Sequence, residues 1–179
     1  VLSGPAASVA GALLYLKITN GIFVEVGGTS TNICIIKNGK PEIRYVTIKN
    51  HPTCIRSMDV RVLGVAGGSM VQVKSNIVAG VGPRSAHIAG LKYSCYAPMD
   101  DLSTGEIIFV KPKPNDIEEY VAIKCKNEIY AITNTCAANA LGRIPEGDYS
   151  YSDPATAKLA LEILGKKLGV SGSQVALSI

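Results

Sequence analysis

A short segment near the start of the chain, residues 24–32, constrains the fold most. It reads Val-Glu-Val-Gly-Gly-Thr-Ser-Thr-Asn and joins two apolar runs of β-forming residues, 22–26 and 32–36. Two glycines directly after an apolar strand permit a tight turn and let the backbone approach a ligand without obstruction by Cβ. The segment therefore predicts a β-hairpin whose turn can present successive N–H groups to an anion such as phosphate.

The side chains around this turn suit a nucleotide. Three hydroxyl residues, 29–31, can donate to phosphate or to a metal-bound water, and Glu25 places a carboxylate beside the turn. Mg²⁺ keeps several waters when it binds a protein, so one carboxylate can orient it through those waters. A tight hairpin whose Thr and Ser satisfy their own backbone explains the same residues, and the sequence leaves both interpretations open.

A second glycine turn follows at residues 64–69, which read Gly-Val-Ala-Gly-Gly-Ser. Alone it is less specific, because a plain bend between a strand and a hairpin has the same composition. Two glycine turns that each follow an apolar run favour two edges of one ligand site.

The remaining pattern alternates strands and helices. Ser3 and Pro5 are typical of a helix start and predict a helix over residues 6–17. Turn residues at 51–53 predict a break, and residues 82–86 predict a loop. We further expect strands at 42–48, 70–73, 77–81, 106–111, 120–126 and 128–133, and helices at 134–141 and 154–168.

Composition limits the function classes. The net charge of +4 comes from 18 basic residues that form no block, so we expect no nucleic-acid partner. The longest early apolar run, 10–16, is too short to span a bilayer, so we expect no membrane partner. Five scattered cysteines without a C-x-x-C pair indicate reduced thiols, most of them buried, and a cytoplasmic location.

Five motifs, in order along the chain, resemble the hydantoinase/oxoprolinase A-type family. Residues 3–12 resemble its S-G-P-A-A-G-V-x-G-A helix, and residues 26–32 resemble its D-[MV]-G-G-T-S-T-D hairpin. Residues 64–69 are similar to G-A-G-G-G-S, residues 81–86 to V-G-P-x-S-A, and residues 138–143 to A-N-x-x-L-G-R.

The resemblance implies an α/β fold of the actin-like (ribonuclease H-like) class, with a mixed sheet, flanking helices and an extra β-hairpin region. Residues 1–179 then form the second actin-like domain of such a protein, with an expanded β insertion at about 97–132. Family members open cyclic amides such as hydantoins with ATP and Mg²⁺, through phosphoryl activation, together with a second subunit or domain. Phosphoryl transfer mainly requires that the protein position the phosphates and neutralise their charge, and glycine turns and hydroxyls can contribute to both.

Mapped onto this chain, the resemblance implies a set of site residues. Glu25 and Asn32 take the catalytic positions, and Glu25 also takes the metal position through a water. The cofactor-binding positions are Gly27, Gly28, Thr29, Ser30, Thr31, Gly67, Gly68 and Ser69.

Three departures from the family pattern leave alternatives open. Glu25 and Asn32 stand where the family has Asp, and Ala66 stands where it has Gly. They favour a non-catalytic or regulatory actin-like nucleotide-binding module as the alternative to an enzyme. A structural module whose glycine turns bind nothing is a third interpretation.

An actin-like ATPase also needs a first phosphate hairpin, and this chain carries only the one at residues 26–32. Because the chain begins at Val1 without Met, we expect an excised domain. Its expected partners are a missing N-terminal domain of the same protein and a second hydantoinase-type subunit. We expect no ATP hydrolysis by the 179-residue chain alone.

Overall fold

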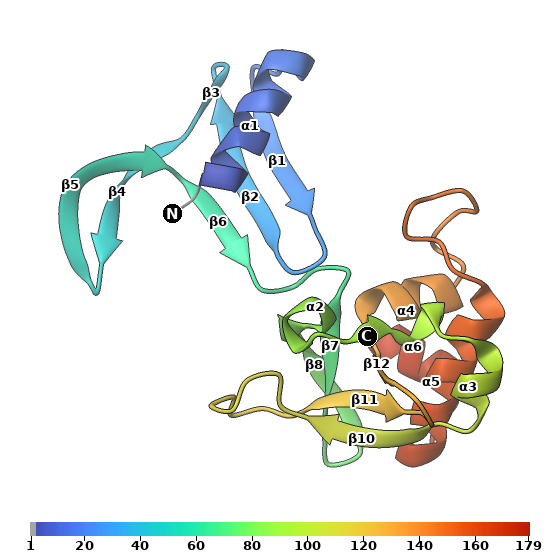
Figure 1. The fold of residues 1–179 in the computed structure, drawn as a ribbon. Coiled ribbons are helices and arrows are strands. Elements are labelled where there is room, and N and C mark those ends of the chain that lie inside the picture. Colours follow the sequence, from blue (N-terminus) through green and yellow to red (C-terminus); the bar gives the residue numbers. More distant parts are fainter. Residues whose placement is uncertain (1–2) are drawn as a thin grey trace. The chain divides into compact units, whose positions relative to one another are not determined.

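The computed structural model describes residues 3–179, which divide into two compact units (Figure 1). Unit 1 comprises residues 3–26 and 30–63, and unit 2 comprises residues 27–29 and 64–179. Each unit has a hydrophobic core of its own.

Unit 1 consists of one helix on an antiparallel sheet (Figure 1). The sheet has the order β1-β2-β3, and β6 also pairs with β2. Val9 of the helix is fully buried against Cys34 and Val60 of the sheet. A helix is present as predicted over residues 6–17, and it begins earlier, at Ser3. The elements are α1 (Ser3–Leu16), β1 (Gly21–Val26), β2 (Thr31–Lys37), β3 (Lys40–Pro41) and β6 (Val60–Leu63).

A two-stranded ribbon extends from this unit, formed by β4 (Ile43–Ile48) and β5 (His51–Met58) (Figure 1). The predicted break at residues 51–53 is therefore wrong. The chain reverses at Lys49 and Asn50, whose φ angles of 48° and 65° form the turn. Pro52 is accommodated because a two-stranded ribbon leaves each strand one edge without a ladder partner.

Unit 2 begins with the hairpin of β7 (Ser69–Lys74) and β8 (Ile77–Ser85). Its turn lies at Ser75 and Asn76, both with positive φ, as predicted. The loop predicted at residues 82–86 is wrong, because β8 continues to Ser85 past two irregularities in its register with β7. The short helix α2 (Ala86–Ala89) follows directly.

A mixed four-stranded sheet of order β10-β11-β12-β9 forms the centre of unit 2. Its β12–β9 pair is parallel and its other pairs are antiparallel. The strands are β9 (Lys92–Tyr93), β10 (Glu106–Val110), β11 (Tyr120–Lys124) and β12 (Ile129–Ala131). Strand β11 is almost wholly buried, so the region predicted as an insertion, 97–132, supplies a central core strand.

Helices pack beside this sheet and complete the core (Figure 1). Helix α5 matches the predicted helix 154–168; Asp153 caps its start, and its Leu161 and Leu164 are fully buried. Ser171 and Gln174 form a reciprocal capping box at the start of the last helix. The helices are η1 (Ser94–Tyr96), α3 (Met99–Ser103), α4 (Asn134–Ala140), α5 (Pro154–Leu168) and α6 (Gly172–Ser178).

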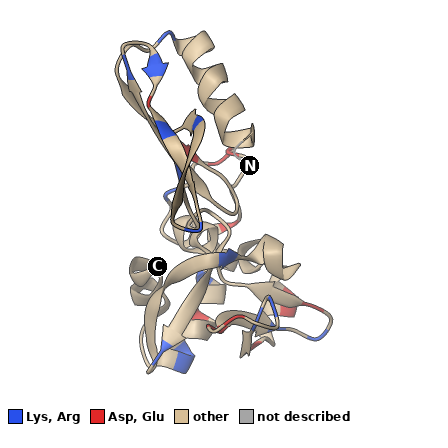
Figure 2. Ribbon diagram, turned by 90° about the vertical axis from the view of Figure 1, so that its left-hand side faces the viewer, with Lys and Arg blue, Asp and Glu red and all other residues tan. Residues whose placement is uncertain are grey.

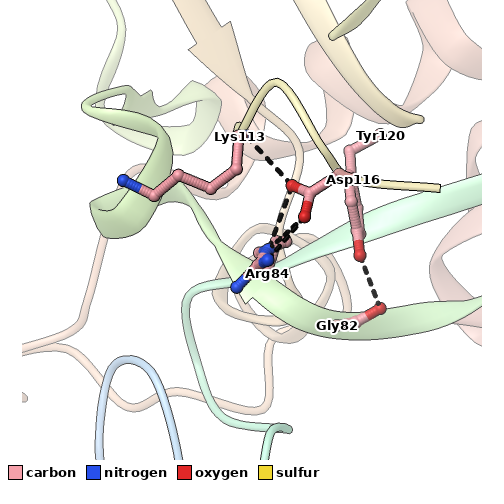
Figure 3. A network of polar contacts seen from close by, with 5 residues as sticks. All are labelled: Gly82, Arg84, Lys113, Asp116 and Tyr120. Atoms are coloured by element: carbon pink, nitrogen blue, oxygen red, sulfur yellow. Dashed lines mark hydrogen bonds and ion pairs between the residues drawn. The ribbon is translucent and has the colours of Figure 1, made fainter. Parts of the chain in front are cut away.

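The loop between β10 and β11 is tied to β8 by a polar network (Figure 3). The Nε of Arg84 donates to both oxygens of Asp116, at 2.8 and 3.0 Å, and the Lys113 N–H donates to one of them at 3.0 Å. The Tyr120 hydroxyl donates to the Gly82 carbonyl at 3.3 Å. Hydrogen bonds from Arg84 hold the pKa of the Asp116 carboxyl below its usual range.

Charged side chains are dispersed over both units (Figure 2). Within residues 3–179, no helix combines the length and apolar character needed to cross a bilayer. Four cysteines are buried free thiols, and Cys54 is exposed.

Candidate functional site

The two predicted glycine turns lie against each other in unit 2. The Gly67 N–H donates to the Gly27 carbonyl at 3.1 Å, and the Gly68 N–H donates to the Gly28 carbonyl at 2.8 Å. These two bonds run between successive residues of the turns and hold segment 27–29 on segment 66–69. The N–H groups of Gly67 and Gly68 are thereby used within the protein, so they do not face a ligand.

The close approach of the two turns explains the glycines of the second one. A Cβ on Gly68 would clash with the Tyr93 hydroxyl and lie 2.5 Å from the Gly28 carbonyl oxygen. A Cβ on Gly67 would lie 2.8 Å from Thr135 Oγ1. Burial raises the pKa of the Tyr93 phenol, which therefore stays a neutral hydroxyl at physiological pH.

The second turn is also held by hydrogen bonds from Ser69, Asn134 and Thr135. The buried Ser69 accepts a hydrogen bond from the Ala66 N–H at its Oγ, at 2.8 Å, and its own N–H donates to the Ala66 carbonyl. Asn134 donates to that carbonyl at 2.9 Å, and Thr135 donates to the Gly67 carbonyl through both its N–H and its hydroxyl. Residues 66–69 thus form a rigid platform under the first turn.

The first turn differs from this platform because three of its backbone N–H groups are not used within the described residues. Gly27 and Gly28 are exposed, and the Thr29 hydroxyl lies 3.1 Å from the Ser85 hydroxyl. Across residues 3–179, the backbone N–H groups of Gly28, Thr29 and Ser30 donate to no acceptor. Successive unused N–H groups on a turn of this kind can bind an anion.

The predicted catalytic pair lies together in unit 1. Glu25 and Asn32 face each other across the β1–β2 ladder. The Asn32 Nδ2 donates to Glu25 Oε2 at 2.9 Å, and the Ser8 hydroxyl of α1 donates to Glu25 Oε1 at 2.9 Å. The Asn32 Oδ1 is buried and accepts no hydrogen bond from the described residues.

The structure thus brings the predicted residues together in two groups, one in each unit. Residues 27–29 and 67–69 meet in unit 2, while Glu25, Ser30, Thr31 and Asn32 belong to unit 1. Within residues 3–179, no three His, Cys, Asp or Glu side chains cluster to hold a metal. One carboxylate still suits Mg²⁺, which takes few protein ligands and completes its shell with waters and phosphate.

Sequence reasoning missed the side chains that support these residues. Ser8, Tyr93 and Thr135 contact the predicted site residues but are distant from them in sequence. Ser8 lies in the resembling helix, where residue spacing gives no sign of its contact with Glu25. Such contacts depend on tertiary packing and leave no local signal.

Comparisons with known proteins agree with this architecture. The family model described as hydantoinase/oxoprolinase matches residues 1–179. The chain belongs to the hydantoinase/oxoprolinase family. Comparison with the sequences of curated proteins gave no significant match.

This hydantoinase/oxoprolinase chain is also similar to a solved structure. The nucleotide-free structure of acetone carboxylase, from work on ATP-dependent acetone carboxylation, aligns with a TM-score of 0.64 at 20% sequence identity. The match covers 97% of this chain and 22% of the acetone carboxylase chain. The predicted α/β fold of actin-like type, with a mixed sheet and flanking helices, is thereby confirmed, as is the family resemblance.

Proposed function

We propose that this chain is the nucleotide-binding half of an ATP-dependent hydantoinase/oxoprolinase-type hydrolase. The observation that carries the proposal is the turn at residues 27–30, whose two glycines are exposed and where three successive N–H groups are unused within the described chain. Family membership and the likeness to an ATP-dependent carboxylase support a nucleotide as the ligand.

In this proposal the two glycine turns have different roles. The first turn binds the phosphates through Gly27, Gly28, Thr29, Ser30 and Thr31. The second turn, with Gly67, Gly68 and Ser69, supports segment 27–29 of the first turn. In the proposal Glu25 is the carboxylate that would orient Mg²⁺ through water. When bound, ATP supplies the phosphoryl group that activates an amide oxygen of the cyclic substrate. We also propose an N-terminal domain and a second hydantoinase-type subunit as partners of this chain.

A second candidate is a nucleotide-binding regulatory module with no catalytic step. Two observations favour it. The N–H groups of Gly67 and Gly68 donate to carbonyls within the protein, and both Glu25 oxygens already accept hydrogen bonds. Both candidates require that the turn bind phosphate, so they share the first test.

That test is a titration of the chain with Mg-ATP, comparing the wild type with Gly28→Ala. A Cβ on Gly28 would make only an ordinary contact, 3.7 Å from the Tyr93 hydroxyl, so this variant keeps the fold while placing a methyl on the phosphate-facing turn. We expect at least a tenfold loss of affinity with little change in melting temperature. Equal affinities for the two proteins would overturn the proposal.

A further inference from the structure

We propose that Ser8, Glu25 and Asn32 form a coupled positioning triad, which fixes α1 on the stem of the β1–β2 hairpin and thereby holds the strand ends Val26 and Thr31, between which the glycine turn runs in the sequence. The triad lies within unit 1, and its three members come from three different elements. Only the role of the turn itself rests on the proposed function.

The geometry centres on one carboxylate. Each Glu25 oxygen accepts one hydrogen bond of 2.9 Å, one from the Ser8 hydroxyl and one from the Asn32 amide. Hydrogen bonds to a charged acceptor are stronger than those between neutral groups. Among residues 3–179, Glu25 takes part in no ion pair, so neutral donors alone hold its charge.

A neutral amide at position 32 suits the Glu25 carboxylate that faces it. An Asp there has no donor when ionised and would place a second carboxylate against Glu25, so that one of the two would need a proton or a cation. Glu25 also fixes the orientation of the Asn32 amide, because the reversed amide would bring oxygen against oxygen. The other amide atom, Oδ1, is buried and accepts no hydrogen bond from the described residues.

Each of these three residues also differs from the family motif that its segment resembles, and Ala66 of unit 2 is a separate departure. In the resembling helix, residues 3–12, the chain differs from the motif only at Ser8, which replaces Gly. In the hairpin motif it differs only at Glu25 and Asn32, which both replace Asp. All three departures meet at one carboxylate. The Glu25 side chain reaches the Ser8 hydroxyl, and the Asn32 amide adds no second charge beside the carboxylate.

The experiment uses the 179-residue chain without nucleotide, so its outcome does not depend on whether ATP binds. The variants are Ser8→Ala, Ser8→Thr, Asn32→Asp and the double variant Ser8→Ala/Asn32→Asp. Asn127→Asp, the same change at an exposed turn, is the matched control. Melting temperature and hydrogen exchange of the α1, β1 and β2 amides are measured with and without millimolar Mg²⁺.

We expect Asn32→Asp to lower the melting temperature by about 4–8 °C and to speed exchange in unit 1. Mg²⁺ should restore most of that loss, because it neutralises the new carboxylate pair, and it should leave the wild type and Asn127→Asp unchanged. Ser8→Thr should keep the protection against hydrogen exchange that Ser8→Ala loses. The melting temperature of the double variant should fall by less than the sum of the falls in the two single variants.

Three results would overturn the triad. These are an Asn32→Asp protein as stable as the wild type without metal, equal exchange in Ser8→Ala and Ser8→Thr, or strictly additive losses in the double variant. If Asn32→Asp does not fold without metal, the Ser8 variants still decide the matter. Failure of Mg-ATP to bind the wild type would count against the proposed function and leave the triad standing.

Discussion

Gly68→Ala tests the account of the paired glycine turns, because the added methyl has no space. Its Cβ would clash with the Tyr93 hydroxyl and lie 2.5 Å from the Gly28 carbonyl oxygen, which accepts the Gly68 N–H hydrogen bond at 2.8 Å. Relief requires that Tyr93 or the 27–29 turn move. Overpacking costs about 1–3 kcal/mol, and loss of one backbone hydrogen bond adds roughly 1 kcal/mol.

We therefore expect Gly68→Ala to lose about 2–4 kcal/mol, a fall of roughly 4–16 °C in melting temperature for a chain of this size. Urea unfolding followed by circular dichroism measures the loss. Tyr93→Phe in the Gly68→Ala background removes the clashing hydroxyl and should recover part of it. Gly28→Ala, whose Cβ meets nothing closer than 3.7 Å, is the control. A Gly68→Ala protein as stable as the control would refute the close approach of the turns.

Two further predictions concern unit 2 and the thiols. The pKa of Asp116 is lowered by its hydrogen bonds from Arg84, so their contact is complete above the carboxyl's ordinary value of 3.8 and is lost as the pH falls through the lower folded-state value. An NMR titration of the Arg84 Nε–H should show this change, and Asp116→Asn should abolish it; a resonance unaffected by acid in the wild type would disprove the contact. Among the five cysteines only Cys54 is exposed, so a thiol reagent should label one site rapidly in the native protein. Cys54→Ser should remove that label, and persistent fast labelling would show that a buried thiol is accessible.

Local chemistry made much of the fold predictable from sequence. The Asp153-Pro154 start of α5, the turn at Ser75-Asn76 and the strands around residues 24–32 each carry a short-range signal, and the structure has all of them. The last helix also had such a signal, because Ser171 and Gln174 have capping-box spacing, but our sequence analysis did not predict it.

The errors arose where tertiary context outweighs local preference. Pro52 indicated a break, yet a two-stranded ribbon accommodates it in β5. At the site, the sequence indicated two glycine turns near one ligand but could not assign their roles. Which turn exposes its N–H groups depends on Tyr93 and Thr135, which pack against Gly67 and Gly68 from distant parts of the chain.

The most direct test of the central claim is an amide NMR titration of the chain with Mg-ATP at millimolar concentration, where even a weakly binding half-site gives a signal. The account predicts that the Gly28, Thr29 and Ser30 amides shift most, since they face the phosphates. The Gly67 and Gly68 amides, which donate to the first turn, should move much less. If the first group stays unshifted at saturating nucleotide, or the second group shifts more, the turn at residues 27–30 is not the phosphate site.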